Sequence, residues 1–252
     1  MLVAERQQKI VELVNIKSSI RVSELSEYFS VTEETIRRDL EKLERENKLK
    51  RSHGGAVRIQ EEDPDVAERE ITNVTEKKAI ANEAAKLVES GDRIILDASS
   101  TAWYMAKALP NIPLTVITNS IKVSMELSKK DKIEVISTGG KLNPKSMSHV
   151  GPLAERSLDM YHVNKTFISC KGLHLENGLS DSNEEQAILK KRMAERSDKV
   201  IVMADSSKFG VKGFSQIMPI NNAHHIMTDS KIDSGIKEKL EGLQLKIHIA
   251  KI

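Results

Sequence analysis

The sequence predicts an α/β protein with a small N-terminal helical domain and a larger, doubly wound, mostly parallel α/β domain. Over the first 47 residues, apolar side chains recur at helical spacing in three short segments. From residue 77 onward, short β-branched apolar runs alternate with helical patterns, which indicates a parallel sheet with helices on both faces. A chain of 252 residues has room for both domains.

Composition excludes several classes of protein. The chain is 39% hydrophobic and 30% charged, as in an ordinary globular protein, and no apolar run approaches the roughly 18 residues of a membrane helix. Its N-terminus becomes charged at Glu5, unlike a signal peptide. The single cysteine, Cys170, excludes a disulfide framework, and the seven histidines lack metal-binding spacing. We therefore expect a cytoplasmic protein with no membrane partner, no metal and no cofactor.

Three helices are predicted at the N-terminus. The segments 5–16, 23–29 and 33–47 each place apolar side chains on one face. Thr32 suits the N-cap of the third helix, and two acidic residues follow it at the positive end of the helix dipole. Only two residues separate the second and third helices, so the connection between them is a tight turn.

A basic hairpin is predicted directly after the third helix. Residues 48–59 alternate in character around Gly54-Gly55, which predicts two short strands joined by a glycine turn. The formal net charge of the whole chain is only +2, but positions 37–58 hold eight basic and four acidic residues. A basic hairpin beside a helix is typical of a wing that contacts DNA phosphates without reading sequence.

The outward face of the third helix predicts contact with DNA bases. On a helical wheel, Glu34, Arg38 and Arg45 lie opposite the apolar Ile36. A short helix, a tight turn and an amphipathic helix with a basic outer face form a helix-turn-helix, whose second helix enters the major groove. A plain three-helix bundle with a solvated charged face is the alternative. The candidate residues for binding double-stranded DNA are Ser23, Thr32, Glu34, Thr35, Arg37, Arg38, Arg45, Lys48, Lys50, Arg51 and His53.

The larger domain begins after a polar segment. Residues 60–76 are acidic and contain Pro64, which predicts a linker between a domain at 1–59 and another at 77–252. A parallel sheet of this kind binds ligands at the carboxyl ends of its strands, and nearly every apolar run that predicts a strand here ends in a polar residue. Strands are predicted at 93–98, 114–120, 133–140, 165–172, 199–207, 224–230 and 247–250, and helices at 76–90, 101–109, 121–130, 183–197 and 234–241.

The loops after these strands predict a pocket for an anion. The segment "DASST" (97–101) precedes a helix, so its hydroxyls and free N–H groups can form an anion cradle, although simple helix capping by the same serines is the alternative. "TGGK" (138–141) offers a second glycine turn without the spacing of a P-loop. The candidate effector-binding residues are Asp97, Ser99, Ser100, Thr101, Asn119, Gly139, Gly140, Lys141, Lys171, Asp181, Glu184 and Lys208.

Two sets of motifs resemble one bacterial family. Arg6, Ile10 and Val14 are each separated by three residues, and seventeen residues lie between Val14 and "TEETIRRDL" (32–40). This spacing resembles the N-terminal signature of the DeoR family of transcriptional regulators. "GLSDSNEEQAILKK" and "ADSSKFG" resemble the C-terminal domain of the same family. The resemblance implies a fold similar to ribose-5-phosphate isomerase and a phosphorylated sugar as effector. A homo-oligomer (dimer or tetramer) is expected, because paired half-sites on DNA give both affinity and specificity. It also implies a repressor of a carbohydrate catabolic operon, with an activator as the other possibility.

Two residues depart from the pattern of that family. Ser99 stands where members commonly have glycine, and Lys171 stands where they commonly have an acidic residue. In the related enzymes this second loop carries the acidic groups that transfer the proton, and a lysine offers no obvious base at neutral pH. We therefore expect that the protein has no catalytic residues and is not an enzyme. The alternative is a sugar-phosphate isomerase or deaminase fused to a DNA-binding module.

Overall fold

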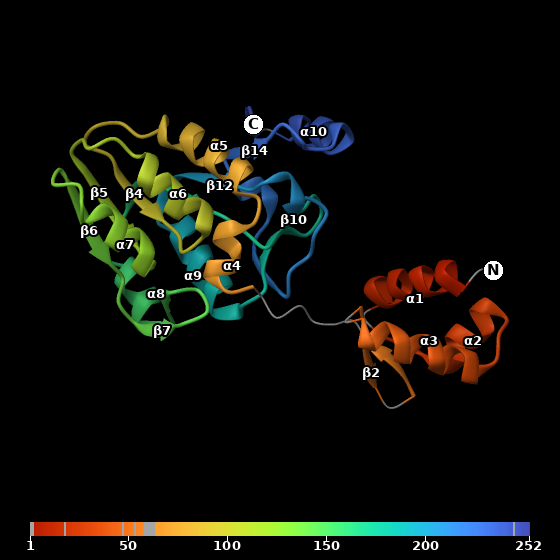
Figure 1. Ribbon diagram of the computed structural model, residues 1–252. Coiled ribbons are helices and arrows are strands. Elements are labelled where there is room, and N and C mark those ends of the chain that lie inside the picture. The colour runs from red at the N-terminus through yellow and green to blue at the C-terminus, as the bar shows by residue number, and fades with distance from the viewer. Residues whose placement is uncertain (1–2, 18, 47, 53, 58–63, 244) are drawn as a thin grey trace. The chain divides into compact units, whose positions relative to one another are not determined.

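The chain divides into two units, residues 1–62 and 63–252, shown in the computed structural model of Figure 1. The structure describes residues 3–17, 19–46, 48–52, 54–57, 64–243 and 245–252. Each unit has its own hydrophobic core, and each is described separately below.

The described part of the smaller unit contains three helices and a small antiparallel sheet. Its core consists of buried side chains from all three helices, such as Ile10, Leu25 and Leu40. The first strand was not predicted, because three residues are too few to show an alternating pattern. The elements are α1 (Val3–Lys17), α2 (Val22–Phe29), α3 (Glu33–Arg45), β1 (Ser19–Arg21), β2 (Lys50–Ser52) and β3 (Gly55–Val57), with strand order β1-β3-β2.

Local contacts explain the start and the seating of α3. Thr32 is its N-cap, and the threonine hydroxyl accepts the backbone N–H of Thr35 at 3.3 Å. Asp39 is buried and points away from the outer face of α3, toward α1. Its carboxylate accepts from Arg6 Nε at 2.6 Å and from Gln7 Nε2 at 2.8 Å. Asp39 therefore anchors α1 to α3, while the arginines beside it remain exposed.

The glycine pair of the hairpin has a steric cause. Gly54 occupies the turn with φ +87°, in the left-handed region that favours glycine. A Cβ at Gly55 would lie 2.3 Å from the backbone oxygen of Ile20 in β1. Only glycine at position 55 lets β3 approach β1 this closely.

The larger unit is built on a seven-stranded sheet whose described neighbours all run parallel. Each strand lies within or overlaps one of the seven predicted runs, so the predicted fold class is confirmed. The sheet order is β15-β14-β12-β9-β4-β5-β6. The strands are β4 (Arg93–Leu96), β5 (Leu114–Thr118), β6 (Ile133–Ser137), β9 (Val163–Ile168), β12 (Ser197–Met203), β14 (His225–Asp229) and β15 (Lys246–Ala250).

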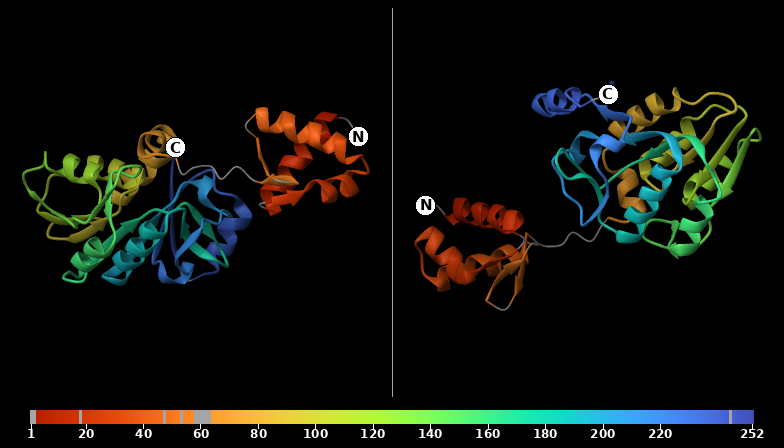
Figure 2. Two further views of the ribbon diagram at one scale, coloured as in Figure 1. Left: turned by 90° about the horizontal axis from the view of Figure 1, so that it is seen from below. Right: turned by 180° about the vertical axis from the view of Figure 1, so that it is seen from behind.

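Helices cover both faces of this sheet (Figure 1 and Figure 2). Successive strand residues point to opposite faces, so Ile94 and Leu96 belong to one core and Ile95 belongs to the other. The first core includes α5 (Val74–Ala85), α6 (Ser100–Ala108) and α7 (Ile121–Leu127), and the second includes α8 (Pro152–Leu158), α9 (Glu184–Glu195) and α10 (Ser234–Glu241).

Several elements were not predicted. The segment assigned to a linker, 60–76, contains α4 (Val66–Ile71) and the first residues of α5; its residues 60–63 lie outside the described part. Asp65 caps α4 by accepting the N–H of Glu68 at 2.9 Å, in a stretch with no helical apolar pattern. The other additions are α8, the hairpin β7 (Lys141–Asn143) and β8 (Ser148–Val150), the antiparallel strands β10 (Gly172–His174), β11 (Gly178–Asp181) and β13 (Ser215–Met218), and two 3-10 turns, η1 (Ser206–Lys208) and η2 (Ile220–Asn222).

Within the described residues, no helix combines the length and the apolar character that a membrane crossing requires.

Candidate functional site

The outer face of α3 presents basic side chains to solvent. The Arg38 side chain is 78% exposed and that of Arg45 is 74% exposed. Both pair with acidic residues one turn earlier, Arg38 with Glu34 at 3.4 Å and Arg45 with Glu41 at 2.8 Å. Exposed ion pairs of this kind contribute little to stability. The arginines are therefore free to exchange these partners for a polyanion.

The remaining candidate DNA contacts divide by their surroundings. Arg37 pairs with Glu33 at 2.6 Å on the flank of α3, while Thr32 and Thr35 share a 2.9 Å hydroxyl contact that supports the cap. Lys48 pairs with Glu46 at 2.6 Å. Exposed positions on α2 and along the hairpin hold Ser23, Lys50 and Arg51, and His53 lies outside the described residues.

A cationic cavity of about 200 Å³ lies in the larger unit, at the carboxyl ends of β4 and β9. Five basic side chains line it, against two carboxylates, Glu68 and Asp181. A cavity of about 430 Å³ between α9 and β13 lies elsewhere and gathers no comparable cluster of cations. The basic residues of the β4–β9 cavity are Arg69, Lys77, Lys171, Lys190 and Lys208.

The start of α6 forms one wall of this cavity. Ser99 is the N-cap, and its hydroxyl accepts the N–H of Ala102 at 3.0 Å. The N–H groups of the next two residues, Ser100 and Thr101, are left without helical partners, and both residues line the cavity. Capping and an anion cradle are therefore compatible here, because one serine caps the helix while its neighbours present free donors.

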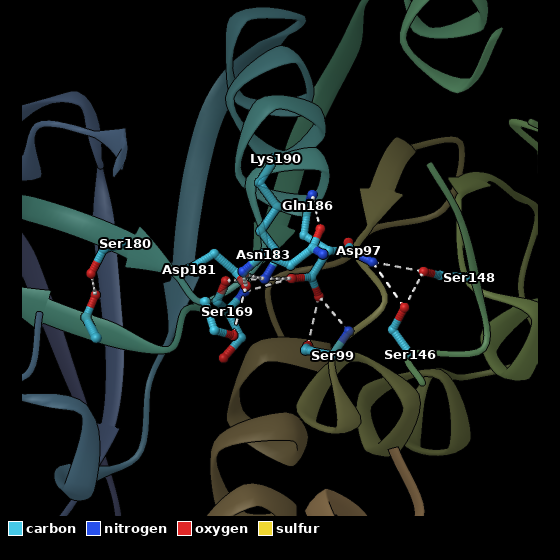
Figure 3. Close-up of polar contacts among 12 residues, drawn as sticks. Asp97, Ser99, Ser146, Ser148, Ser169, Ser180, Asp181, Asn183, Gln186 and Lys190 are labelled. Atoms are coloured by element: carbon cyan, nitrogen blue, oxygen red, sulfur yellow. Dashed lines mark hydrogen bonds and ion pairs between the residues drawn. The ribbon is translucent and has the colours of Figure 1, made fainter. Parts of the chain in front are cut away.

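Asp97 lies behind the cavity instead of lining it. Its side chain is fully buried, and Oδ1 accepts the backbone N–H and the hydroxyl of Ser99 at 3.1 and 2.6 Å. Oδ2 accepts the N–H of Ser169 at 2.9 Å, as Figure 3 shows. Asp97 thus ties the loop after β4 to the loop after β9, and positions cavity residues without touching the space itself.

Lys190 joins these loops to α9. Its Nζ lies 2.7 Å from Asp181 Oδ2 and 3.4 Å from Asp97 Oδ2, and donates to the backbone oxygen of Ser169 (Figure 3). Burial alone would lower the pKa of Lys190, but the two carboxylates outweigh burial and raise the pKa above its ordinary value. For Asp181, burial favours the neutral acid, and Lys190 outweighs it and lowers the pKa. Both groups are charged at neutral pH.

Two other titratable groups at the cavity have pKa values shifted by burial. Lys77 is 5% exposed, and burial lowers its pKa from 10.5 to about 8. Its Nζ donates to the backbone oxygens of Arg69 and Thr72 at 2.6 and 2.8 Å. Burial also raises the pKa of the Cys170 thiol to about 12, so this cysteine is a thiol at neutral pH and a poor nucleophile.

Besides Asp97, five further predicted residues do not line this cavity. Asn119 is buried and donates to the backbone oxygen of His149 at 3.0 Å. The glycine turn follows β6 at the edge of the sheet, and its Lys141 pairs with Glu185 at 3.0 Å. A Cβ at Gly140 would lie 2.9 Å from a backbone oxygen of β8, so close packing explains this glycine. The residues placed away from the cavity are Asn119, Gly139, Gly140, Lys141 and Glu184.

Other cavity residues were missed by the sequence analysis. Arg69 and Thr72 belong to the segment assigned to a linker, and Lys77 stands in an unremarkable charged stretch. Lys190 was detectable in principle, because it falls on the buried face of α9 between Gln186 and Met193, where a charged residue needs a buried partner. The missed lining residues are Pro64, Glu68, Arg69, Thr72, Lys77, Ser169, Cys170, Ser182 and Lys190.

Known proteins resemble this chain over nearly its whole length. HTH-type transcriptional regulator YulB of Bacillus subtilis, described as uncharacterized, is 67% identical over 249 residues, which cover 98% of this chain and 96% of that protein. The L-fucose operon activator of Haemophilus influenzae is 36% identical and covers 94% of this chain and 96% of its own length. Ribose 5-phosphate isomerase A from Methanocaldococcus jannaschii, a solved structure, covers 55% of each chain with 21% identity and a TM-score of 0.42.

Two family descriptions match the two parts of the chain. Residues 6–62 match the DeoR-like helix-turn-helix domain, and residues 72–230 match the DeoR C terminal sensor domain. These matches agree with the three helices and hairpin of the smaller unit and with the parallel sheet of the larger one. The chain therefore belongs to the DeoR family of DNA-binding, helix-turn-helix transcriptional regulators.

Proposed function

We propose that this regulator represses a carbohydrate catabolic operon and that a phosphorylated sugar bound in the larger unit relieves the repression. Repression demands least of the protein, since operator binding alone blocks a promoter without any contact to the polymerase. One relative is named an activator, so activation is the competing proposal. Transcription in vitro from the bound promoter, with and without the protein, separates the two.

The cationic cavity carries the proposal of an anionic ligand. Five basic side chains and the free N–H groups of α6 converge on one space, and one of its two carboxylates, Asp181, is already paired with Lys190. An adjoining cavity of about 200 Å³ shares Arg69, Asp181 and Lys190 with the first, and adds amides and hydroxyls, among them Asn143, Ser146 and Gln186. Cations and helix N–H groups suit a phosphate, and amides and hydroxyls suit a sugar.

We propose binding without catalysis. Lys171 lines the cavity where related enzymes carry acidic residues, and the Cys170 pKa of about 12 leaves no thiolate. Asp97 and Asp181 are committed to internal hydrogen bonds and an ion pair, so among the described carboxylates at the cavity only Glu68 is available to accept a proton from a ligand. A coupled assay with pentose and hexose phosphates tests this, because turnover above the blank would favour the isomerase alternative.

We propose that the two units have separate roles in DNA binding and ligand sensing, and that the protein acts as a cytoplasmic homo-oligomer. Residues 1–59 would bind the operator, residues 77–252 would provide most of the ligand site, and residues 60–76 would connect the two functions and add Arg69 and Thr72 to the cavity. We expect a dimer or a tetramer, because binding to paired half-sites on the operator raises both affinity and specificity. Light scattering on the purified protein, free and bound to DNA, measures the number of chains.

Thermal-shift measurements against a panel of sugar phosphates test the proposed ligand. A ligand present at about a hundredfold excess over its Kd should raise the melting temperature by about 5–10 °C. Lys208→Gln, at the cavity, should reduce this shift. The matched Lys141→Gln, which removes an exposed lysine outside the cavity, should not. Equal shifts from unphosphorylated sugars would contradict the role assigned to the cations.

A further inference from the structure

One wall of the cationic cavity is α4, the first helix of the larger unit. Glu68 and Arg69 of α4 and Thr72 just after it line the space. In the chain, β3 of the smaller unit ends at Val57 and α4 begins at Val66. The helix that forms this wall of the cavity is therefore also the first described helix after the smaller unit in sequence.

Polar contacts hold α4 more than apolar packing does. Within this six-residue helix only Val66 is buried, and Ile71 is 78% exposed. Lys77 Nζ donates to the backbone oxygens of Arg69 and Thr72, and the Tyr104 hydroxyl donates to the backbone oxygen of Glu70 at 2.9 Å. A helix this short is unstable alone, and few apolar contacts place it among the least stable parts of a fold.

Two side chains at α4, Arg69 of the helix and Lys77 beside it, have donors left for a ligand. Among the described residues, the Nε atoms of Arg69 and Arg196 are buried without a hydrogen-bond partner, and of these two residues Arg69 lines the cavity. The Lys77 ammonium carries three N–H donors, of which the two backbone oxygens use two. Lys77 also lines the cavity. Donors left over beside a cationic space indicate where an anion completes the structure.

We infer that an anion bound in this cavity completes the seat of α4, through Arg69 and Lys77, and that α4 is the element through which the larger unit transmits ligand binding. This inference rests on the proposed sugar-phosphate function. The ligand-bound form has α4 docked, and the ligand-free form releases it more often. Because α4 is the first described helix of the larger unit, we place the coupling between ligand binding and DNA binding at this helix.

Hydrogen exchange measured by mass spectrometry on the full chain tests the inference. Inorganic phosphate is the probe, with chloride at equal ionic strength as the blank. Phosphate should slow exchange several-fold in peptides covering residues 64–73. Exchange in α10, which contributes no residue to the cavity, should not change. Arg69→Gln should abolish the slowing in α4. The matched Arg192→Gln removes a partly exposed arginine of α9 that pairs with Glu195 outside the cavity, and should preserve the slowing.

Tyr104→Phe provides a second variant if Arg69→Gln fails to fold. Without the hydroxyl, α4 should exchange faster in chloride, and phosphate should still slow it. A rise in melting temperature with phosphate but unchanged exchange in α4 overturns the inference and leaves the proposed anion site standing. No rise in melting temperature with phosphate or ribose 5-phosphate contradicts the anion site and the inference together.

Discussion

Lys77 is a cavity residue whose charge changes with pH in the mildly alkaline range. Burial lowers its pKa from 10.5 to about 8, and it faces the charges of Asp205, Lys208, Arg69 and Glu76. Because the folded pKa lies below the unfolded value, the unfolded chain holds more protons between pH 8 and 10.5. Lys77 therefore destabilises the fold when charged, and its contribution to the free energy of unfolding rises as pH passes through that window.

Ligand affinity should fall as Lys77 loses its proton. A sugar phosphate is already a dianion at pH 8, since its second pKa is about 6. Above pH 8 the affinity should therefore fall by about tenfold per pH unit, until the bound form itself deprotonates. Calorimetric titration from pH 7 to 10 measures this. Lys77→Arg keeps the charge at every pH and should flatten the profile; a profile unchanged by that variant would assign the titration to another group.

Asp39 is the buried charge on which the smaller unit depends. Asp39→Ala leaves Arg6 and Gln7 without their carboxylate, and breaking one side of a buried ion pair costs about 3–5 kcal/mol. Denaturant unfolding followed by circular dichroism should show this loss for the smaller unit. The matched Glu41→Ala breaks only an exposed pair with Arg45, and should change stability by less than about 1 kcal/mol. Equal effects of the two variants would contradict the anchoring role.

At the level of elements, α3 and the hairpin should contribute differently to DNA binding. Arg38→Ala removes an exposed arginine from α3 and should weaken operator binding by about 1–3 kcal/mol, with relaxed preference at one base. Lys50→Ala removes a proposed phosphate contact and should weaken binding to operator and random DNA equally, with a salt slope smaller by about one unit. Fluorescence anisotropy at several salt concentrations measures both, and a base-selective loss in Lys50→Ala would reverse the assignment.

The hairpin itself depends on Gly55. Gly55→Ala places a Cβ 2.3 Å from the Ile20 backbone oxygen, so β3 and β1 must separate. The neighbouring Gly54→Ala meets no atom within 4 Å, and its positive φ alone costs about 1–2 kcal/mol. Gly55→Ala should therefore destabilise the smaller unit more and weaken binding to random DNA, as measured by denaturation and anisotropy. Equal losses in the two variants would show that β1 does not confine the hairpin.

The elements differ in how far sequence predicts them. All seven strands of the parallel sheet were predicted, because buried strands carry their own apolar signal. Helix α4 was missed, because it is held by Lys77 and Tyr104 from other elements. In the cavity, Ser100, Lys171 and Lys208 were found because they follow strands. The glycine turn after β6 was predicted to line the pocket, but it lies away from the cavity. The order of the strands in the sheet decides which loops meet, and local sequence patterns do not specify that order.

For the whole molecule, regulation requires that ligand and operator favour different states. A ligand that binds both states equally shifts nothing, however tightly it binds. Coupling between two sites in one protein is typically about 1–3 kcal/mol, which corresponds to a change of about 5- to 150-fold in affinity. The coupling is also reciprocal, so operator DNA should weaken ligand binding by the same factor.

The most direct test is an operator titration by fluorescence anisotropy, with and without the sugar phosphate that gives the largest thermal shift. Selection from random DNA supplies the operator sequence. The account predicts that saturating ligand raises the operator Kd by about 5- to 150-fold. An operator Kd that stays unchanged at saturating ligand would contradict the claim that the cationic cavity controls DNA binding.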